Sequence, residues 1–301
     1  MRDATRAELF RGLAVMAETP GAPHAQISEA LGLPGVPSSS EYSDVFLFQL
    51  YPYASVYLGP EGMMGGEARD RVAGFWRALG LTPPPEPDHL AALVGLLASL
   101  AERAASVQEP AERLLVDRAR AALLEEHLNP WVFAYLDRVE ELAGPTYRAW
   151  ASILAEALYA ELEHVSAVPD AGVEGAQALL SAHLREAPTV PDPRTSGTGA
   201  FLEGLLAPVR SGVILTRADL AGIATALDLG LRAGERRYAL EHLLTQNPEG
   251  MLQALATECR RQGERHAART RLPLLADFFV DRARSTAGLL ETLADEATAP
   301  A

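Results

Sequence analysis

Apolar residues recur at the helical spacing of three and four positions along almost the whole chain. One series consists of Leu90, Leu93, Val94, Leu97 and Ala101. A second series consists of Tyr147, Trp150, Leu154, Ala157 and Leu158. No segment shows the strict alternation of apolar and polar residues that is typical of a half-buried strand. The pattern therefore predicts an all-α fold.

Prolines, glycines and asparagines divide this pattern into separate helices. Asn129 and Asn247 each precede a proline, an arrangement typical of an N-cap followed by the first helical residue. Up to the middle of the chain the predicted helices cover about 5–18, 24–32, 41–58, 66–80, 88–105, 111–128, 130–143, 146–165 and 171–186.

The composition changes after this series of helices. Residues 188–199 are rich in proline, glycine and small polar residues, which favours a flexible linker. Beyond the linker, Thr216 and Asp219 have the spacing of a capping box, and further helices are predicted at about 235–246, 248–268 and 272–296. We therefore divide the chain into a helical domain at 1–187, a linker at 188–199 and a smaller helical module of unknown role at 200–301.

The charged residues exclude several classes of protein. The formal net charge is −14, which argues against a non-specific nucleic-acid binder. All 26 basic residues are arginine, so chemistry that needs a lysine Schiff base or a P-loop lysine is excluded. The single cysteine, Cys259, cannot form an internal disulfide or a Cys₄ zinc site. No apolar stretch is long enough to span a bilayer and no secretory signal is present, so we expect a cytoplasmic protein.

Two segments rich in polar residues are candidates for a functional site. Glu86-Pro87-Asp88-His89-Leu90 opens one predicted helix, and His127-Leu128-Asn129-Pro130-Trp131 lies at the end of the next. Because a short turn at Pro110 separates two helices of similar length, both segments should lie at the same end of a helical hairpin. Each residue also has a structural interpretation: Asp88 as an N-cap, His127 as a cation at a helix C-terminus, and Trp131 as a core anchor.

These two segments, together with Pro52-Tyr53-Ala54-Ser55-Val56-Tyr57-Leu58, resemble the TorD/DmsD family of molybdoenzyme-specific chaperones in order and spacing. The resemblance covers roughly residues 5–185. It implies an all-helical protein that is not an enzyme and has no cofactor, no metal and no catalytic residues. Its partner would be the precursor of a molybdopterin oxidoreductase catalytic subunit, bound through the twin-arginine leader and held until cofactor insertion, with a homodimer possible. The implied client-binding residues are Tyr53, Ser55, Glu86, Asp88, His89, His127 and Trp131.

The chain departs from the family pattern at one position and leaves alternatives open. Leu93 occupies a position where the family often has glutamate, which favours core packing there. A generic helical interaction scaffold is the main alternative function. A helical metal-dependent enzyme is a weaker one, because Glu161 and His164 have the spacing of half a di-iron motif and no second copy accompanies them. The arginines near Cys259 could lower its pKa, but a buried thiol is the default expectation.

Overall fold

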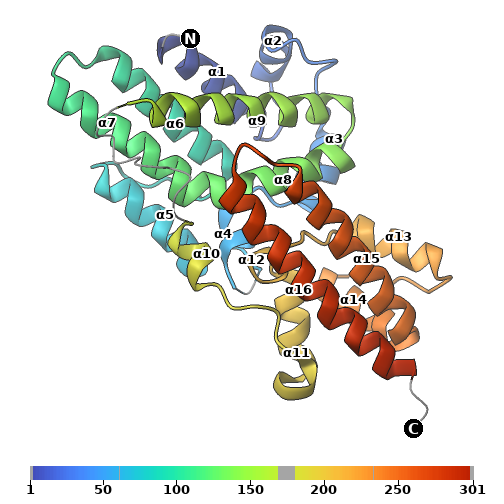
Figure 1. Ribbon diagram of the computed structural model, residues 1–301. Coiled ribbons are helices and arrows are strands. Elements are labelled where there is room, and N and C mark those ends of the chain that lie inside the picture. The colour runs from blue at the N-terminus through green and yellow to red at the C-terminus, as the bar shows by residue number, and fades with distance from the viewer. Residues whose placement is uncertain (1–2, 61, 169–179, 233, 299–301) are drawn as a thin grey trace. The chain divides into compact units, whose positions relative to one another are not determined.

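The computed structural model describes residues 3–60, 62–168, 180–232 and 234–298. These residues are mostly helical and contain no strand, which confirms the predicted all-α fold (Figure 1). Contacts between residues divide the chain into two compact units. Unit 1 consists of Met1–Ser55 and Met64–His183, and unit 2 consists of Val56–Met63 and Leu184–Ala301.

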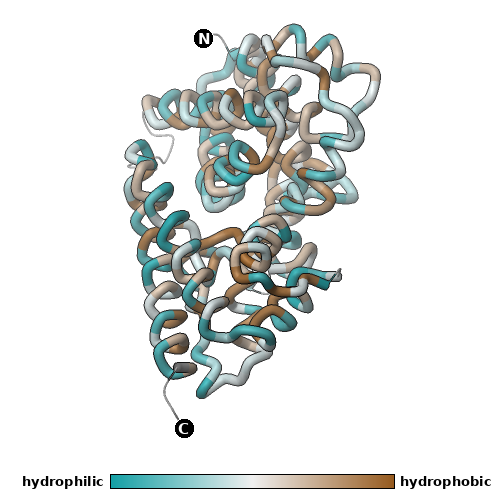
Figure 2. Tube along the Cα trace, turned by 90° about the vertical axis from the view of Figure 1, so that its right-hand side faces the viewer, coloured by the Kyte–Doolittle hydropathy of each residue, from teal (hydrophilic) through white to brown (hydrophobic). Residues whose placement is uncertain are grey.

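Unit 1 is built on helices that pack side by side. Helix α1 (Asp3–Val15) packs along α6 (Leu90–Ser106), and α8 (Asn129–Leu142) packs on α9 (Pro145–Ser166). Helix α7 (Pro110–Ala122) runs back beside α6, and the π-helix η2 (Leu123–Leu128) continues it. The remaining helices are α2 (Pro23–Ala30), α3 (Ser39–Tyr42), the π-helix η1 (Ser43–Gln49) and α5 (Gly66–Ala78). The core includes Phe10, Leu97, Trp131 and Trp150, all fully buried. Hydrophobic and hydrophilic positions mix along these helices, as amphipathic packing requires (Figure 2).

The helix predicted at 41–58 is wrong, because this segment is divided. It consists of α3, η1 and α4 (Ala54–Leu58), with an extended stretch at 50–53. The Leu50 N–H donates to the Val45 carbonyl, five residues back, which closes the π-turn. Leu50 then leaves the helical region with φ −133° and ψ 84°. Pro52 has no N–H to continue a helix, and the Tyr53 N–H donates to the Tyr51 carbonyl at 2.9 Å in a tight turn centred on Pro52.

The predicted N-cap at Asn129 is also wrong. Asn129 has helical torsion angles, φ −53° and ψ −37°, and its backbone N–H donates to the Leu124 carbonyl. Helix α7 therefore continues through η2 into α8 without the free N–H groups that an N-cap serves. The predicted N-cap at Asn247 is confirmed, because its Oδ1 accepts from the Gly250 N–H at 2.9 Å.

Unit 2 has its own hydrophobic core. Two long helices that pack on each other contribute to it, α15 (Pro248–Ala267) and α16 (Pro273–Thr298). Its shorter helices are α11 (Pro193–Leu206), α12 (Pro208–Ser211), α13 (Arg217–Ala226) and α14 (Arg236–Gln246). The capping box of Thr216 and Asp219 is confirmed. Helix α10 (Ala182–Glu186) crosses the boundary between the units. The rest of the predicted helix 171–186 lies largely outside the described residues.

The segment predicted as a flexible linker, 188–199, is helical from Pro193 onwards. Asp192 caps α11, because its Oδ1 accepts from the Arg194 N–H at 2.9 Å. Pro193 then takes the first helical position, where its missing N–H costs nothing. Gly197, with φ 81° and ψ 158°, is not helical, so α11 consists of two helical pieces on either side of it. The glycine of this segment therefore interrupts the helix once, although the residues around it are helical.

Candidate functional site

Two of the three motifs meet in a short antiparallel bridge within unit 1. Tyr53 pairs with His89, and two backbone hydrogen bonds fix the pairing. The Leu90 N–H donates to the Pro52 carbonyl at 2.8 Å, and the Ala54 N–H donates to the Asp88 carbonyl at 3.0 Å. The extended stretch before α4 thereby holds the loop that leads into α6. We call Pro52–Ser55 and Glu86–Leu90 together the bridge site.

Asp88 braces this bridge from inside. The Asp88 Oδ2 atom accepts a hydrogen bond from the Ser55 N–H at 3.1 Å, and Asp88 is only 2 % exposed. The fully buried Ser55 hydroxyl in turn accepts from the Gly65 N–H at 3.0 Å. Asp88 is therefore not the N-cap of α6, as one interpretation of the sequence proposed. Its carboxylate instead ties two segments that are far apart in the sequence.

His89 is the N-cap of α6. Its Nδ1 accepts from the Ala91 N–H at 3.1 Å, so the neutral imidazole carries its proton on Nε2. Burial lowers the pKa of His89, and this effect outweighs the opposing influence of Glu86 and Glu18. The imidazole packs edge-on against the Tyr53 ring, with centroids 4.9 Å apart. Burial and a hydrogen bond to Glu86 raise the pKa of Tyr53, so its hydroxyl stays protonated and donates to that carboxylate.

Two exposed carboxylates remain at the surface of the bridge site. Glu86 belongs to the motif itself, and Glu18, which follows α1, lies close enough to influence the pKa of His89. In the part of the chain that the structure describes, neither carboxylate forms an ion pair with an arginine. Their negative charge is available to a cationic group from another molecule.

His127 and Trp131 are buried in unit 1, and η2, which carries His127, packs on α6 as the predicted hairpin requires. His127 packs against Phe75, with ring centroids 4.7 Å apart, and burial together with His183 lowers its pKa to about 4. It is therefore neutral at pH 7, contrary to the interpretation of a cation at a helix end. The Trp131 indole N–H donates to the His127 carbonyl at 2.9 Å, and its ring packs against Tyr135. The structural interpretation of Trp131 as a core anchor is confirmed.

The structure adds residues that the sequence analysis missed. Glu18 belongs to no motif, so nothing in the sequence indicates it. Arg69 on α5 donates to the Pro85 carbonyl at 3.1 Å, next to Glu86. The proline-rich sequence before Glu86 does not indicate that an arginine binds there. Gly65 has φ 92°, which favours glycine. The Gly65-Gly66 pair in the sequence is the signal that could have indicated this special backbone position. Leu93 is fully buried, as its departure from the family pattern predicts.

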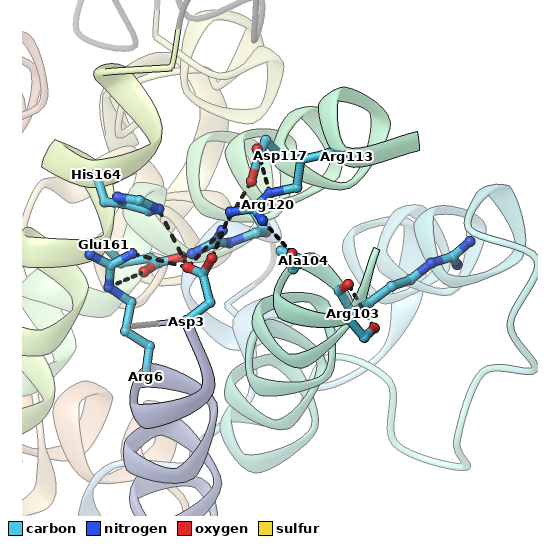
Figure 3. Close-up of polar contacts among 10 residues, drawn as sticks. Asp3, Arg6, Arg103, Ala104, Arg113, Asp117, Arg120, Glu161 and His164 are labelled. Carbon is cyan, nitrogen blue, oxygen red and sulfur yellow. Dashed lines mark hydrogen bonds and ion pairs between the residues drawn. The ribbon is translucent and has the colours of Figure 1, made fainter. Parts of the chain in front are cut away.

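Glu161 and His164, the candidates for a metal site, belong to a network of buried charges. Arg120, which is fully buried, donates through Nε to Glu161 at 2.8 Å and through Nη1 to Asp117 at 3.0 Å (Figure 3). His164 Nε2 lies 3.5 Å from Asp3 Oδ1. Because Glu161 is committed to a guanidinium, it does not act as a free ligand. Among the described residues, no group of three or more histidine, cysteine or carboxylate side chains is arranged to hold a metal.

Two further features were expected from the sequence. Burial raises the pKa of Cys259 to about 12, which contradicts a lowered pKa and confirms a buried thiol. In the described ranges, none of the helices combines the length and apolarity needed to cross a bilayer.

Residues 25–137 match the family model of the nitrate reductase delta subunit. This is a family of molybdoenzyme assembly chaperones that includes the TorD and DmsD proteins, and its members are not catalytic. The resemblance is thereby confirmed over this segment, which contains all seven candidate residues. No curated protein matches the chain.

Proposed function

We propose that this chain is a cytoplasmic chaperone that binds the precursor of a molybdopterin oxidoreductase catalytic subunit through its twin-arginine leader. The chaperone would hold the precursor until its cofactor has been inserted. The observation that carries the proposal is the family match over 25–137, because this segment contains the whole bridge site. The finer assignment to a leader peptide rests on the surface chemistry of that site.

The proposed contacts for the two arginines are Glu86 and Glu18. A guanidinium binds a carboxylate through two parallel hydrogen bonds, and both carboxylates are exposed without an arginine of their own. The Tyr53 hydroxyl holds Glu86 on one side. Asp88 faces inward to Ser55, so we assign it the role of positioning the bridge rather than touching the client.

An apolar surface for the rest of the leader is offered by η1. Leu47 and Phe48 are 47 % and 51 % exposed, although both are large apolar side chains. Only three residues separate the end of η1 from Tyr53. A leader combines arginines with an apolar stretch, so acidic and apolar surfaces close together in the chain suit it.

Calorimetric titration of a twin-arginine leader peptide tests the proposal. We expect binding that weakens as salt rises, because exposed charge pairs are screened. Glu86→Gln and Glu18→Gln should each weaken binding roughly two- to fivefold, the range for single exposed ion pairs. Glu29→Gln, on the exposed surface of α2, is the matched control and should bind like wild type.

Two results would contradict the proposal. A peptide with both arginines replaced by glutamine should bind much more weakly, and equal binding would exclude recognition of the arginines. If neither a leader nor a full-length molybdoenzyme precursor binds, the chaperone function fails and a generic helical scaffold becomes the better interpretation. The stoichiometry of the titration, compared with the mass in solution, also tests whether a homodimer is the binding species.

A further inference from the structure

The four methionines that the structure describes fall into two different environments. Met16 and Met251 are fully buried, with 0 % exposure. Met63 and Met64 are consecutive and are 66 % and 59 % exposed. Met63 is the most exposed of the large apolar side chains among the described residues, and two consecutive methionines are therefore accessible to solvent.

Glycines on either side fix the backbone that carries this methionine pair. Gly62 has φ 63°, and a Cβ atom there would lie 2.8 Å from the Leu206 carbonyl oxygen, so only glycine fits. On the other side, Gly65 has φ 92°, and its N–H donates to the buried Ser55 hydroxyl. Met64 is therefore attached directly to a residue that is hydrogen-bonded to the bridge site.

The chain offers an oxidant no competing thiolate. Cys259 is the single cysteine, and it is fully buried. Burial raises its pKa to about 12, so the thiol stays protonated at neutral pH. A thiolate, when one is accessible, reacts with peroxides in preference to a thioether. With this thiol protected, the accessible sulfur atoms among the described residues are those of Met63 and Met64.

We propose that Met63 and Met64 form a site of reversible oxidation by hydroperoxides, and that sulfoxide at Met64 weakens client binding at the bridge site. The thioether sulfur attacks the outer peroxide oxygen, the S–O bond forms and the O–O bond breaks. Sulfur loses two electrons, and the hydroperoxide is reduced to an alcohol, or to water when the oxidant is hydrogen peroxide. The product is a polar sulfoxide that peptide methionine sulfoxide reductases convert back. The effect on the client rests on the proposed function, whereas the modification itself does not.

The physical reason for the effect is the loss of apolar contact area. A methionine side chain beside the bridge site can pack against the apolar stretch of a leader. Sulfoxide carries a strongly polar S=O group that must give up water to make the same contact. Losing much of that apolar contact should weaken binding roughly tenfold.

The test uses the full-length protein treated with dilute hydrogen peroxide, followed by peptide mass spectrometry and titration with the leader peptide. We expect Met63 and Met64 to be oxidised at least about tenfold faster than Met16 and Met251, because reaction follows exposure. The oxidised protein should bind more weakly, and sulfoxide reductase should restore binding. The affinity of Met64→Leu should be the same before and after treatment with peroxide, whereas the affinity of Met16→Leu, the matched control, should still fall.

Each failure has a different meaning. If the untreated protein does not bind any leader or precursor, the proposed function fails, and the oxidation rates still test the modification site. Equal oxidation of the exposed and buried methionines would overturn the site. Selective oxidation of Met63 and Met64 with unchanged client affinity would overturn the regulatory effect alone.

Discussion

Replacing Asp88 by alanine should release the bridge between the two motifs. The substitution removes the acceptor of the Ser55 N–H, which is buried and bonds to Asp88 at 3.1 Å. A buried N–H left without a partner costs about 1 to 3 kcal/mol. The same bridge carries the hydrogen bonds from Leu90 to Pro52 and from Ala54 to Asp88, so the loss should be felt across all of them.

Native-state hydrogen exchange measures this loss at the residues concerned. A destabilisation of about 2 kcal/mol should accelerate exchange of the Ser55 amide roughly thirtyfold, because each 1.4 kcal/mol is a factor of ten. Asp88→Asn keeps an oxygen that can accept from Ser55, so its amide should exchange much closer to the wild-type rate. Client affinity should follow the same order, with Asp88→Asn near wild type and Asp88→Ala weaker.

Two observations would refute this reasoning. Unchanged protection of the Ser55 amide in Asp88→Ala would mean that the carboxylate does not brace the bridge. Loss of client binding in Asp88→Asn, with exchange at Ser55 unaltered, would mean that the charge itself contacts the client and that the positioning role is wrong.

Three further predictions concern stability. Arg120→Met should cost up to about 3 to 5 kcal/mol in denaturant unfolding, because it leaves the buried Glu161 with only the more distant Arg6, whose Nε lies 3.7 Å from Oε2. A cost below about 1 kcal/mol would mean that Arg6 or water compensates the carboxylate. The pKa of His127 is lowered from 6.5 to about 4, so between these pH values the unfolded chain binds a proton that the folded chain does not. The free energy of unfolding should therefore fall as the pH drops from 6.5 to about 4, by on the order of 3 kcal/mol at most. In His127→Phe this part of the pH dependence should disappear from the unfolding curves. Asn247→Ala should cost about 0.5 to 2 kcal/mol through loss of a cap, whereas Asn129→Ala removes no cap and should lower the thermal midpoint less.

The helices were predictable wherever local sequence decides their ends. The capping box at Thr216 and the Asn247-Pro248 pair specify helix starts through contacts within three residues, and both are confirmed. The same logic failed at Asn129, where a π-turn uses the backbone N–H that a cap would leave free. The same dipeptide, Asn-Pro, occurs at both positions. The difference lies in the turn that precedes it, and a π-turn leaves no mark in the spacing of apolar residues.

The contacts within the bridge site were not predictable from local sequence. The resemblance grouped Tyr53, Ser55, Glu86, Asp88 and His89 only as implied client-binding residues, and helix geometry predicted no contact between the two segments that carry them. The interpretation of Asp88 as an N-cap is wrong, because its carboxylate accepts from the Ser55 N–H, 33 residues away, and His89 caps α6 instead. Pairing across such a separation has no local signature.

The π-turn in η2 also determines where the chain can lose a residue. A π-turn contains one residue more than an α-helical turn, and here it is closed by the bond from Asn129 to Leu124. Deleting a single residue such as Glu125 would convert the segment into a regular α-helix and leave Trp131 facing the core. A deletion within the regular turns of α9 would instead rotate every later side chain by about 100° and turn buried positions outward. Among related chains of different length, η2 is therefore the place in this hairpin where a one-residue gap preserves the packing.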